Sequence, residues 1–311
     1  MVTEKKKTGF VNTVFAEGNV VTMIGHMGSG KTDKAVFFME KAVSHGFHCF
    51  TIINFFDYND VGKACNLGKL RTGVTYLKKP DEIHIVRKLS DLLLGLFEHE
   101  KNLVVLDESG LFVSSTQATS KKVRTLKQLV YIIRHLNASI LFITQSRKSL
   151  VPDIRETLVT YQLQIKKISE NNRRMIVSRP LPHISDDGDE IVSFLPIDKI
   201  DDIPCSQLPY DSKFLPAFKI DIDLSELLDD MADLDSMEVI EQGKAAVEKQ
   251  IERRKNKGKV KATKKDLIKT EFYNDTKLTL KGLAKKYKTS YPNVKNIHAE
   301  FLREISSWVS K

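Results

Sequence analysis

Two hydrophobic patterns alternate along the first two thirds of the chain. Short runs of consecutive apolar residues, rich in valine and isoleucine, have the character of buried strands. They cover residues 20–24, 47–55, 102–106 and 139–144. Between them, apolar residues recur every three or four positions, as in Ala35, Phe38, Met39 and Ala42, which is typical of a helix packed on a sheet. The alternation continues to about residue 200 and predicts a three-layer α/β domain with a mostly parallel sheet.

Less regular segments give further expectations. Residues 74–77 are a candidate third strand, and the residues after Pro80 predict a helix because their apolar positions form one stripe. The stripe consists of Ile83, Ile85, Val86, Leu89, Leu92, Leu93 and Leu96. We expect a further helix that ends near His135, and two strands at 157–168 and 175–180 that are joined by a turn.

A glycine-rich turn follows the first apolar run and leads into the first helical series. Its residues are Gly25, His26, Met27, Gly28, Ser29, Gly30, Lys31 and Thr32. This spacing of glycines, lysine and threonine matches a phosphate-binding loop. Backbone N–H groups would face phosphate oxygens, Lys31 would reach the β- and γ-phosphates, and the Thr32 hydroxyl would ligate Mg²⁺. A chance match is the alternative, but the strand before the turn and the helix after it favour the nucleotide site.

The apolar run 102–106 ends in two carboxylates, Asp107 and Glu108. An acidic residue at a strand end beside a phosphate loop can hold Mg²⁺, and the next carboxylate can orient or deprotonate an attacking water. Such an ending is common by itself and gains weight from the loop before it. Together the two motifs favour a hydrolase over a small-molecule kinase, which needs no water-activating glutamate.

The next apolar run ends in Gln145, and Arg134 lies just before it. Gln145 would emerge beside Asp107 near the γ-phosphate, where a polar side chain could sense hydrolysis; a buried glutamine that caps its strand is the alternative. Arg134 lies near the end of its expected helix, where the helix dipole favours any cation. It could instead be an arginine finger that acts on a neighbouring subunit's ATP, which requires a ring.

The composition changes beyond residue 200. Acidic residues are concentrated within 198–241, which we interpret as a tether, a partner-docking segment or a solvated linker. Basic residues follow, starting on a helix expected at 237–255, and suit either phosphate contact or a solvated surface. The expected division is a phosphate-loop ATPase domain at 1–200, a linker at 201–263 and a helical module at 264–311.

The C-terminal module has the apolar spacing of a helix-turn-helix. Helices are expected near 267–272, at 280–287 and at 292–308, with Lys288 in a turn where glycine is frequent. The packing positions would be Leu283, Ala284, Tyr287, Val294 and Ile297. A DNA-binding module would face the groove with Tyr291, Asn293, Lys295 and Asn296. A three-helix bundle without a DNA role is the alternative.

Whole-chain composition limits the classes of protein that fit. The 311 residues carry a net charge of +9, which allows a polyanionic partner, and 41% of them are hydrophobic, enough for a substantial core. The three cysteines are too scattered for a disulfide framework and lack zinc-ligand spacing, which indicates a reducing setting. No apolar run reaches the length of a membrane span. We therefore expect an unsecreted, cytoplasmic protein.

The block 133–147, together with 152–155, resembles the FtsK/HerA superfamily of DNA-translocating and DNA-packaging ATPases. In that superfamily an arginine precedes the strand, the strand ends in Thr-Gln or Ser-Gln, and an arginine-rich segment follows. The resemblance extends over roughly residues 18–167. The strand end here reads Thr-Gln-Ser-Arg instead of Thr-Gln-Arg-Pro, so the segment after the sensor departs from the pattern.

The resemblance implies a RecA-like and FtsK/HerA-like phosphate-loop fold, with ATP and Mg²⁺ as ligands. It implies Lys31 and Thr32 as phosphate and Mg²⁺ ligands, Asp107 on the metal, Glu108 as the catalytic base, Gln145 as the sensor and Arg134 as the trans-acting finger. It also implies a ring, hexameric or pentameric, that moves double-stranded DNA through its centre.

The compact domain without membrane anchors fits the viral packaging and plasmid-mobilisation branches better than the cell-division translocases. Expected partners are therefore duplex DNA, further copies of the chain, and a capsid portal or transfer-complex protein, in a cell, in an infected host cell or on a virion. Two alternatives stay open. One is an ATP-switched DNA-binding regulator or partition factor, and the other is a phage-morphogenesis assembly ATPase, which would need a membrane partner.

Overall fold

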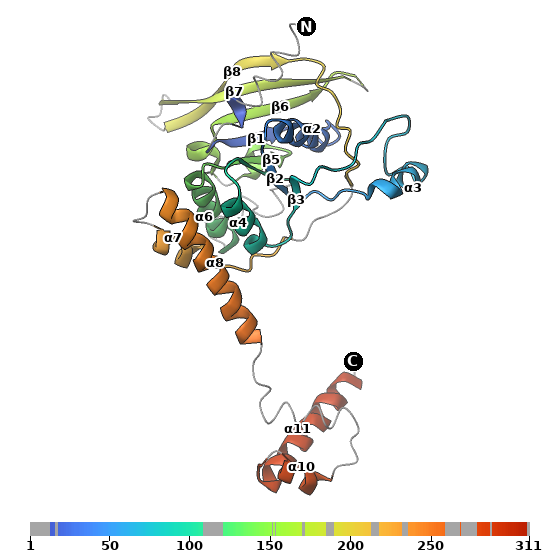
Figure 1. The fold of residues 1–311 in the computed structure, drawn as a ribbon, viewed down its shortest axis with the longest axis vertical. Helices are drawn as coiled ribbons and strands as arrows, with labels where there is room; N and C mark the ends of the chain where they lie inside the picture. Colours follow the sequence, from blue (N-terminus) through green and yellow to red (C-terminus); the bar gives the residue numbers. More distant parts are fainter. Residues whose placement is uncertain are drawn as a thin grey trace. The chain divides into compact units, whose positions relative to one another are not determined.

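The computed structural model describes most of the chain. The described residues are 13–15, 18–107, 121–150, 152, 154–169, 172–184, 190–212, 218–231, 236–258, 268, 279–286 and 288–309. The chain divides into two compact units, Met1–Glu248 and Lys249–Lys311. Figure 1 shows their helices and strands. Within the described residues, no helix combines the length and apolar character that a membrane span requires.

The first unit is built on eight strands. They are β1 (Val20–Ile24), β2 (His48–Thr51), β3 (Ile83–Ile85), β4 (Asn102–Leu106), β5 (Ser139–Thr144), β6 (Tyr161–Lys167), β7 (Arg173–Ile184) and β8 (Glu190–Ile200). One sheet contains them all, in the order β3-β2-β4-β5-β1-β6-β7-β8. The first six in this order run parallel, and β7 and β8 extend the sheet in antiparallel fashion. The expected α/β class with a mostly parallel sheet is confirmed.

Helices connect the parallel strands and also follow the last strand of the sheet. They are α2 (Lys31–Ser44), α3 (Val61–Asn66), α4 (Leu89–Glu98), α6 (Lys121–His135), α7 (Leu224–Met231) and α8 (Ser236–Gly258), with the short turns η1 (Tyr58–Asp60), η3 (Arg147–Ser149) and η4 (Ile154–Leu158). Helix α2 lies on one face, and α4 and α6 lie on the other (Figure 1). Right-handed crossovers require this arrangement, because the chain moves one way along the sheet after β1 and the other way after β3.

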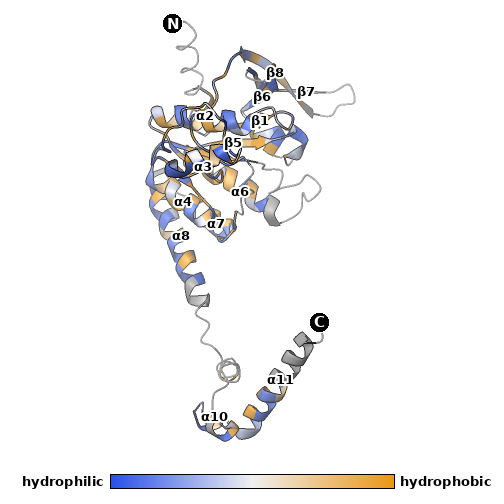
Figure 2. Cartoon of the chain, turned by 90° about the vertical axis from the view of Figure 1, so that its right-hand side faces the viewer, coloured by the Kyte–Doolittle hydropathy of each residue, from blue (hydrophilic) through white to orange (hydrophobic). Residues whose placement is uncertain are grey.

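The core forms where α2 packs on alternate residues of the strands. Ala35, Phe38 and Met39 of α2 are buried together with Val21 and Met23 of β1. Figure 2 shows the contrast between the apolar strand β5 and the mostly hydrophilic helix α8. Burial of this kind stabilises the fold by about 25 cal/mol for each Å² of apolar surface removed from water. The buried face of α2 therefore fixes the position of the loop that precedes this helix.

The segment after Pro80 differs from the sequence-based expectation. The expected single helix is wrong: residues 83–85 form strand β3, paired in parallel with β2, and α4 starts only at Leu89. Ile83 is buried, and Ile85, two positions later on the same face of the strand, is exposed where this edge strand ends. Within the described range 18–107, residues 74–77 form no strand, and Tyr76 instead packs on Ala64 in a small satellite cluster.

Part of the acidic segment is attached to the first unit. Ile203 and Leu208 are buried in the core beside α2. Glu40 of α2 accepts hydrogen bonds from Ser206 Oγ (2.5 Å) and from the backbone N–H groups of residues 207 (2.8 Å) and 208 (3.0 Å). Further along, Asp221 accepts hydrogen bonds from the Ser90 N–H and hydroxyl at the start of α4. These contacts attach residues 203–208 and Asp221 to the sheet domain.

Among the residues of the second unit that are described, two helices follow the end of α8: α10 (Leu280–Lys286) and α11 (Tyr291–Val309). Buried residues from both helices meet around Ile268, and Figure 1 shows α10 beside α11. The cluster consists of Ile268, Leu283, Ala284 and Val294, with Leu280 and Ile297 packed against it. Lys288 has a positive φ of 46° in the turn, the conformation that glycine adopts most easily. Tyr287, the remaining expected packing residue, lies outside the described residues.

Candidate nucleotide-binding site

The phosphate loop joins the end of β1 to the start of α2. Gly30 has a left-handed φ of 88° and precedes α2, whose first turn receives no side-chain cap from the described residues. Its first N–H groups are therefore available to an anion. A Cβ on Gly25 would lie 2.6 Å from the Ile165 carbonyl oxygen of β6, so only glycine fits at the start of the loop.

The side chains of the loop are arranged around the space a phosphate would fill. Lys31 Nζ donates hydrogen bonds to the carbonyl oxygens of Gly25 (2.8 Å) and His26 (3.0 Å), so the ammonium lies across the loop. The buried hydroxyl of Ser29 makes no hydrogen bond within the part of the chain that the structure describes. A loop that folds around an ammonium and an unsatisfied hydroxyl is prepared for an external acceptor such as a phosphate oxygen.

Thr32 and Asp107 meet at the start of α2. The Thr32 hydroxyl donates a 2.7 Å hydrogen bond to Asp107 Oδ2, and Asp107 follows the last residue of β4. A hydroxyl beside a carboxylate oxygen belongs to the hard-oxygen donor class that Mg²⁺ prefers, so the two residues fit that ion. Glu108, the expected catalytic base, lies outside the described residues.

Gln145 follows β5, the strand that lies between β1 and β4 in the sheet. Its side chain is exposed. It lines the same pocket as residues 25–29 of the phosphate loop. The pocket has a volume of about 1130 Å³. It is lined by Ile24, Gly25, His26, Met27, Gly28, Ser29, Gln145, Ser146, Arg147, Lys148, Arg155, Glu156, Gln164, Ile165, Lys166, Lys167 and Val192.

Five cations make the wall of this pocket basic: Arg147, Lys148, Arg155, Lys166 and Lys167. Arg147 is fixed there, because it donates a 2.9 Å hydrogen bond to the Val192 carbonyl and its guanidinium lies 4.4 Å from the centre of the Phe194 ring. Burial, followed by repulsion from Arg155, lowers the pKa of Arg147. Arg155 forms an ion pair with Glu156. The wall therefore attracts anions without being fully neutralised.

Arg134 is not part of this pocket. It lies near the end of α6, before β5 begins, and its side chain is exposed. Gln145 lies at the other end of β5, six residues long, which corresponds to about 20 Å at the rise of a strand. Within one chain, Arg134 and the phosphate loop therefore lie at opposite ends of the strands, about the length of β5 apart.

Arg173 is a basic residue near the loop that the sequence reasoning missed. It is the first residue of β7, and its Nε lies 3.2 Å from the position that a Cβ on Gly30 would take. Its Nη1 donates to the carbonyl oxygens of Ser169 (2.5 Å) and Asn172 (3.0 Å), which anchors the side chain. The only sequence signal was the Arg-Arg pair that opens an apolar run.

Strand order and loop geometry define the class of the first unit as a phosphate-loop NTPase fold. A family model described as Zonular occludens toxin (Zot) matches residues 19–178. This is just over half of the chain and extends from β1 into β7. The chain belongs to the Zot family. The more specific FtsK/HerA resemblance stays a prediction.

Three solved structures with similar folds have low sequence identity. They are the N-terminal domain of zonular occludens toxin from Neisseria meningitidis (21% identity, 59% of this chain and 96% of that chain, TM-score 0.33), the DNA-packaging ATPase B204 from Sulfolobus Turreted Icosahedral Virus (11%, 59% and 100%, 0.36), and the flagellar accessory protein FlaH from Methanocaldococcus jannaschii (13%, 60% and 95%, 0.37). The comparison with curated proteins gave no match. At these TM-scores the three structures carry no argument about function.

Proposed function

We propose that the chain is an ATP-hydrolysing motor that acts on duplex DNA, as in genome packaging or the transfer of a mobile element. The observation that supports it best is the contact between Thr32 and Asp107, with Gln145 directly after β5, the strand between β1 and β4. This contact joins the phosphate loop to the acidic strand end, the two halves that ATP hydrolysis needs.

Each residue of the loop has a role in this proposal. Lys31 leaves the carbonyl groups of Gly25 and His26 and pairs with the β- and γ-phosphates, while the uncapped N-terminus of α2 faces the same anion. Thr32 and Asp107 would hold Mg²⁺, and the bound ion would supply positive charge beside the phosphates. Glu108 orients the attacking water, and Gln145 senses the loss of the γ-phosphate.

Two arginines would complete the charge compensation, one from each side of a subunit interface. Arg173 reaches the loop from the same chain, because it lies beside Gly30. Arg134 can reach a nucleotide only from a second copy of the chain, because β5 separates it from the loop of its own chain. This arrangement calls for a closed ring, which we expect to be hexameric or pentameric.

The DNA would contact two surfaces, one in each unit. In the first unit, the wall with Arg147, Lys148 and Lys166 lies in the pocket beside Gln145. In the second unit, Tyr291, Asn293 and Lys295 are exposed at the start of α11, as a helix that enters a major groove requires.

ATP hydrolysis measured with and without DNA tests the proposal. The wild-type chain should hydrolyse ATP faster with long duplex DNA than with short duplex DNA, and should displace a bound roadblock such as a third strand. Lys31→Ala is the control and should do neither. A different result would indicate an ATP-switched DNA-binding regulator. In that case ATP hydrolysis is slow, long duplex DNA does not stimulate it, and the roadblock is not displaced.

A further inference from the structure

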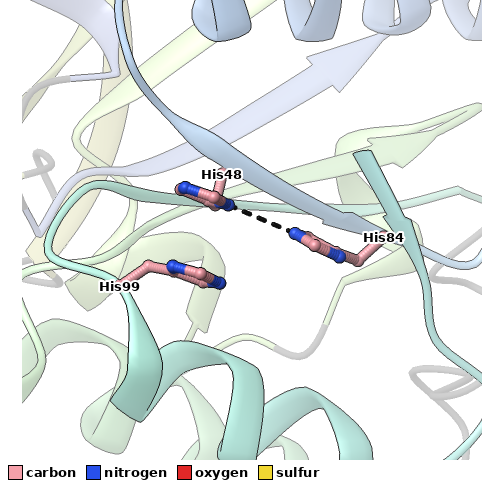
Figure 3. A group of neighbouring side chains, drawn as sticks. All are labelled: His48, His84 and His99. Carbon is pink, nitrogen blue, oxygen red and sulfur yellow. Dashed lines mark hydrogen bonds between the residues drawn. The ribbon is translucent and has the colours of Figure 1, made fainter. Parts of the chain in front are cut away.

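Three histidines from separate elements meet on the α4 side of the sheet. His48 is the first residue of β2, His84 is the central residue of β3, and His99 is the C-cap of α4. Figure 3 shows the three imidazoles next to one another. The phosphate loop follows the C-terminal end of a parallel strand, whereas His48 begins one. The cluster therefore lies toward the opposite end of the strands from the nucleotide site.

The ring nitrogens are close enough to share one ion. One nitrogen from each histidine lies within 4.8 Å of the other two. His48 Nδ1 and His84 Nε2 share a hydrogen bond of 3.2 Å (Figure 3), whose proton a metal ion would replace. Two imidazole nitrogens that bind one tetrahedral zinc ion at 2.0–2.1 Å are about 3.4 Å apart. The spacing of His48 and His84 therefore already matches that of two zinc ligands.

His99 needs only a local change to become the third ligand. Its ring stacks on His48, with centroids 3.5 Å apart and an angle of 2° between the planes. Coordination requires this ring to turn out of the stack, and the χ2 torsion of histidine is broad enough to allow it. The backbone stays in place meanwhile, because the Asn102 amide donates hydrogen bonds to the carbonyl oxygens of His99 (2.7 Å) and Leu96 (3.0 Å).

The surroundings of His84 and His99 favour their neutral forms. Burial lowers the pKa of His84, and the neighbouring His48 and His99 lower it further. Burial and His48 likewise lower the pKa of His99. Neutral imidazole is the form that binds metals. The charged groups around the cluster are Lys79 and Glu82 near His84, and Glu98 near His99, where Lys244 Nζ lies 3.3 Å from Glu98 Oε1.

We propose that His48, His84 and His99 form a binding site for Zn²⁺. Imidazole suits zinc, and three imidazoles leave the fourth tetrahedral position to a water molecule. The ion would tie the end of α4 to β2 and β3, so its main effect would be on the stability of this side of the sheet. The site is independent of the proposed ATP chemistry and stands whether or not the chain is a motor.

Metal titration of the full chain, stripped with a chelator and dialysed, tests the site. We expect calorimetry to show one Zn²⁺ bound per chain, and Zn²⁺ to raise Tm. Co²⁺ in place of Zn²⁺ should give the visible absorption bands of a tetrahedral nitrogen site. His99→Asn should weaken Zn²⁺ binding at least about tenfold, the loss that follows even from disturbing a ligand's supporting contacts. His183→Asn, an exposed histidine of β7, is the matched control and should bind like the wild type.

Two results would overturn the proposal. One is a wild-type chain with Co²⁺ that shows no tetrahedral bands, which needs no variant to interpret. The other is Zn²⁺ affinity in His99→Asn equal to that of the His183→Asn control, which would leave a hydrogen-bonded stack of imidazoles without a metal. His99 suits this test because it lies at an extended C-cap (φ −132°, ψ 145°) and only part of it is buried.

Discussion

The Thr32 hydroxyl and Asp107 Oδ2 are 2.7 Å apart, although the two residues are separated by 75 positions in the sequence. The contact is possible because only one strand, β5, lies between β1 and β4 in the sheet. The start of α2, which follows β1, can therefore reach the end of β4. If Thr32 and Asp107 hold Mg²⁺ together, removal of the Thr32 hydroxyl alone should weaken Mg²⁺ binding.

Removing this hydroxyl should impair hydrolysis at low Mg²⁺. We expect Thr32→Ala to lower kcat at least about tenfold, equivalent to about 1.4 kcal/mol in the barrier, and to raise the Mg²⁺ concentration needed for half-maximal activity. Thr32→Ser keeps the hydroxyl and should stay close to the wild type. ATP hydrolysis measured across a Mg²⁺ titration distinguishes the two. Equal Mg²⁺ dependence in both variants would remove Thr32 from the metal site.

Mixing two inactive variants tests whether Arg134 acts on a neighbouring subunit. Lys31→Ala lacks a working loop but still carries Arg134, whereas Arg134→Ala keeps the loop. If Arg134 acts in trans, mixed oligomers should recover part of the ATPase activity that each variant lacks alone. No recovery, in mixtures that native mass spectrometry shows to contain both variants, would contradict a trans-acting Arg134.

Arg173 should behave in the opposite way in the same assay. Its side chain lies beside Gly30 of its own chain, so Arg173→Ala should lower kcat at least about tenfold and mixing with Lys31→Ala should restore nothing. Arg174→Ala is the matched control. Arg174 follows on the opposite face of β7 and pairs with Asp201, and its loss should leave kcat near the wild-type value. Recovery on mixing would show that Arg173 also acts between subunits.

Local patterns in the sequence predicted the centre of the fold well. The loop between β1 and α2, the strand before Asp107 and the strand before Gln145 all depend on short-range signals: continuous apolar runs, glycine spacing and helical periodicity. The helix expected after Pro80 failed because Ile83, Ile85 and Val86 suit both periods. Pairing with β2, more than thirty positions earlier, decided that residues 83–85 are a strand.

Long-range contacts account for what the sequence could not show. Arg173 reaches Gly30 only because β6 lies beside β1 and β7 turns back along β6. The imidazoles of His48, His84 and His99 meet across three elements, and their spacing along the sequence does not resemble that of a zinc motif. Asp221 contacts Ser90 over 131 positions. An acidic composition by itself indicates a linker. A single carboxylate such as Asp221 can nevertheless attach an acidic segment to the folded domain.

Stability should depend on pH through Glu40. Burial raises the pKa of this carboxyl above its ordinary value of 4.5, so in the window just above pH 4.5 the folded state holds more protons than the unfolded state. The free energy of unfolding contributed by Glu40 is therefore full below pH 4.5 and decreases as pH rises through the folded-state pKa. Glu40→Gln keeps the acceptor oxygen for its three donors and should flatten this dependence in urea unfolding. Glu241→Gln, exposed on α8, should not.

The second unit offers a test of DNA binding that is separate from ATP. Lys295 is exposed at the start of α11, between the buried Val294 and the exposed Asn296. If this face contacts phosphates, Lys295→Gln in the full chain should weaken duplex binding without nucleotide and reduce the slope of log K against log salt by about 0.9. Lys281→Gln on α10 makes the same charge change elsewhere in the unit. An equal loss in both variants would indicate unspecific attraction, and no loss in either would leave a helical bundle without a DNA role.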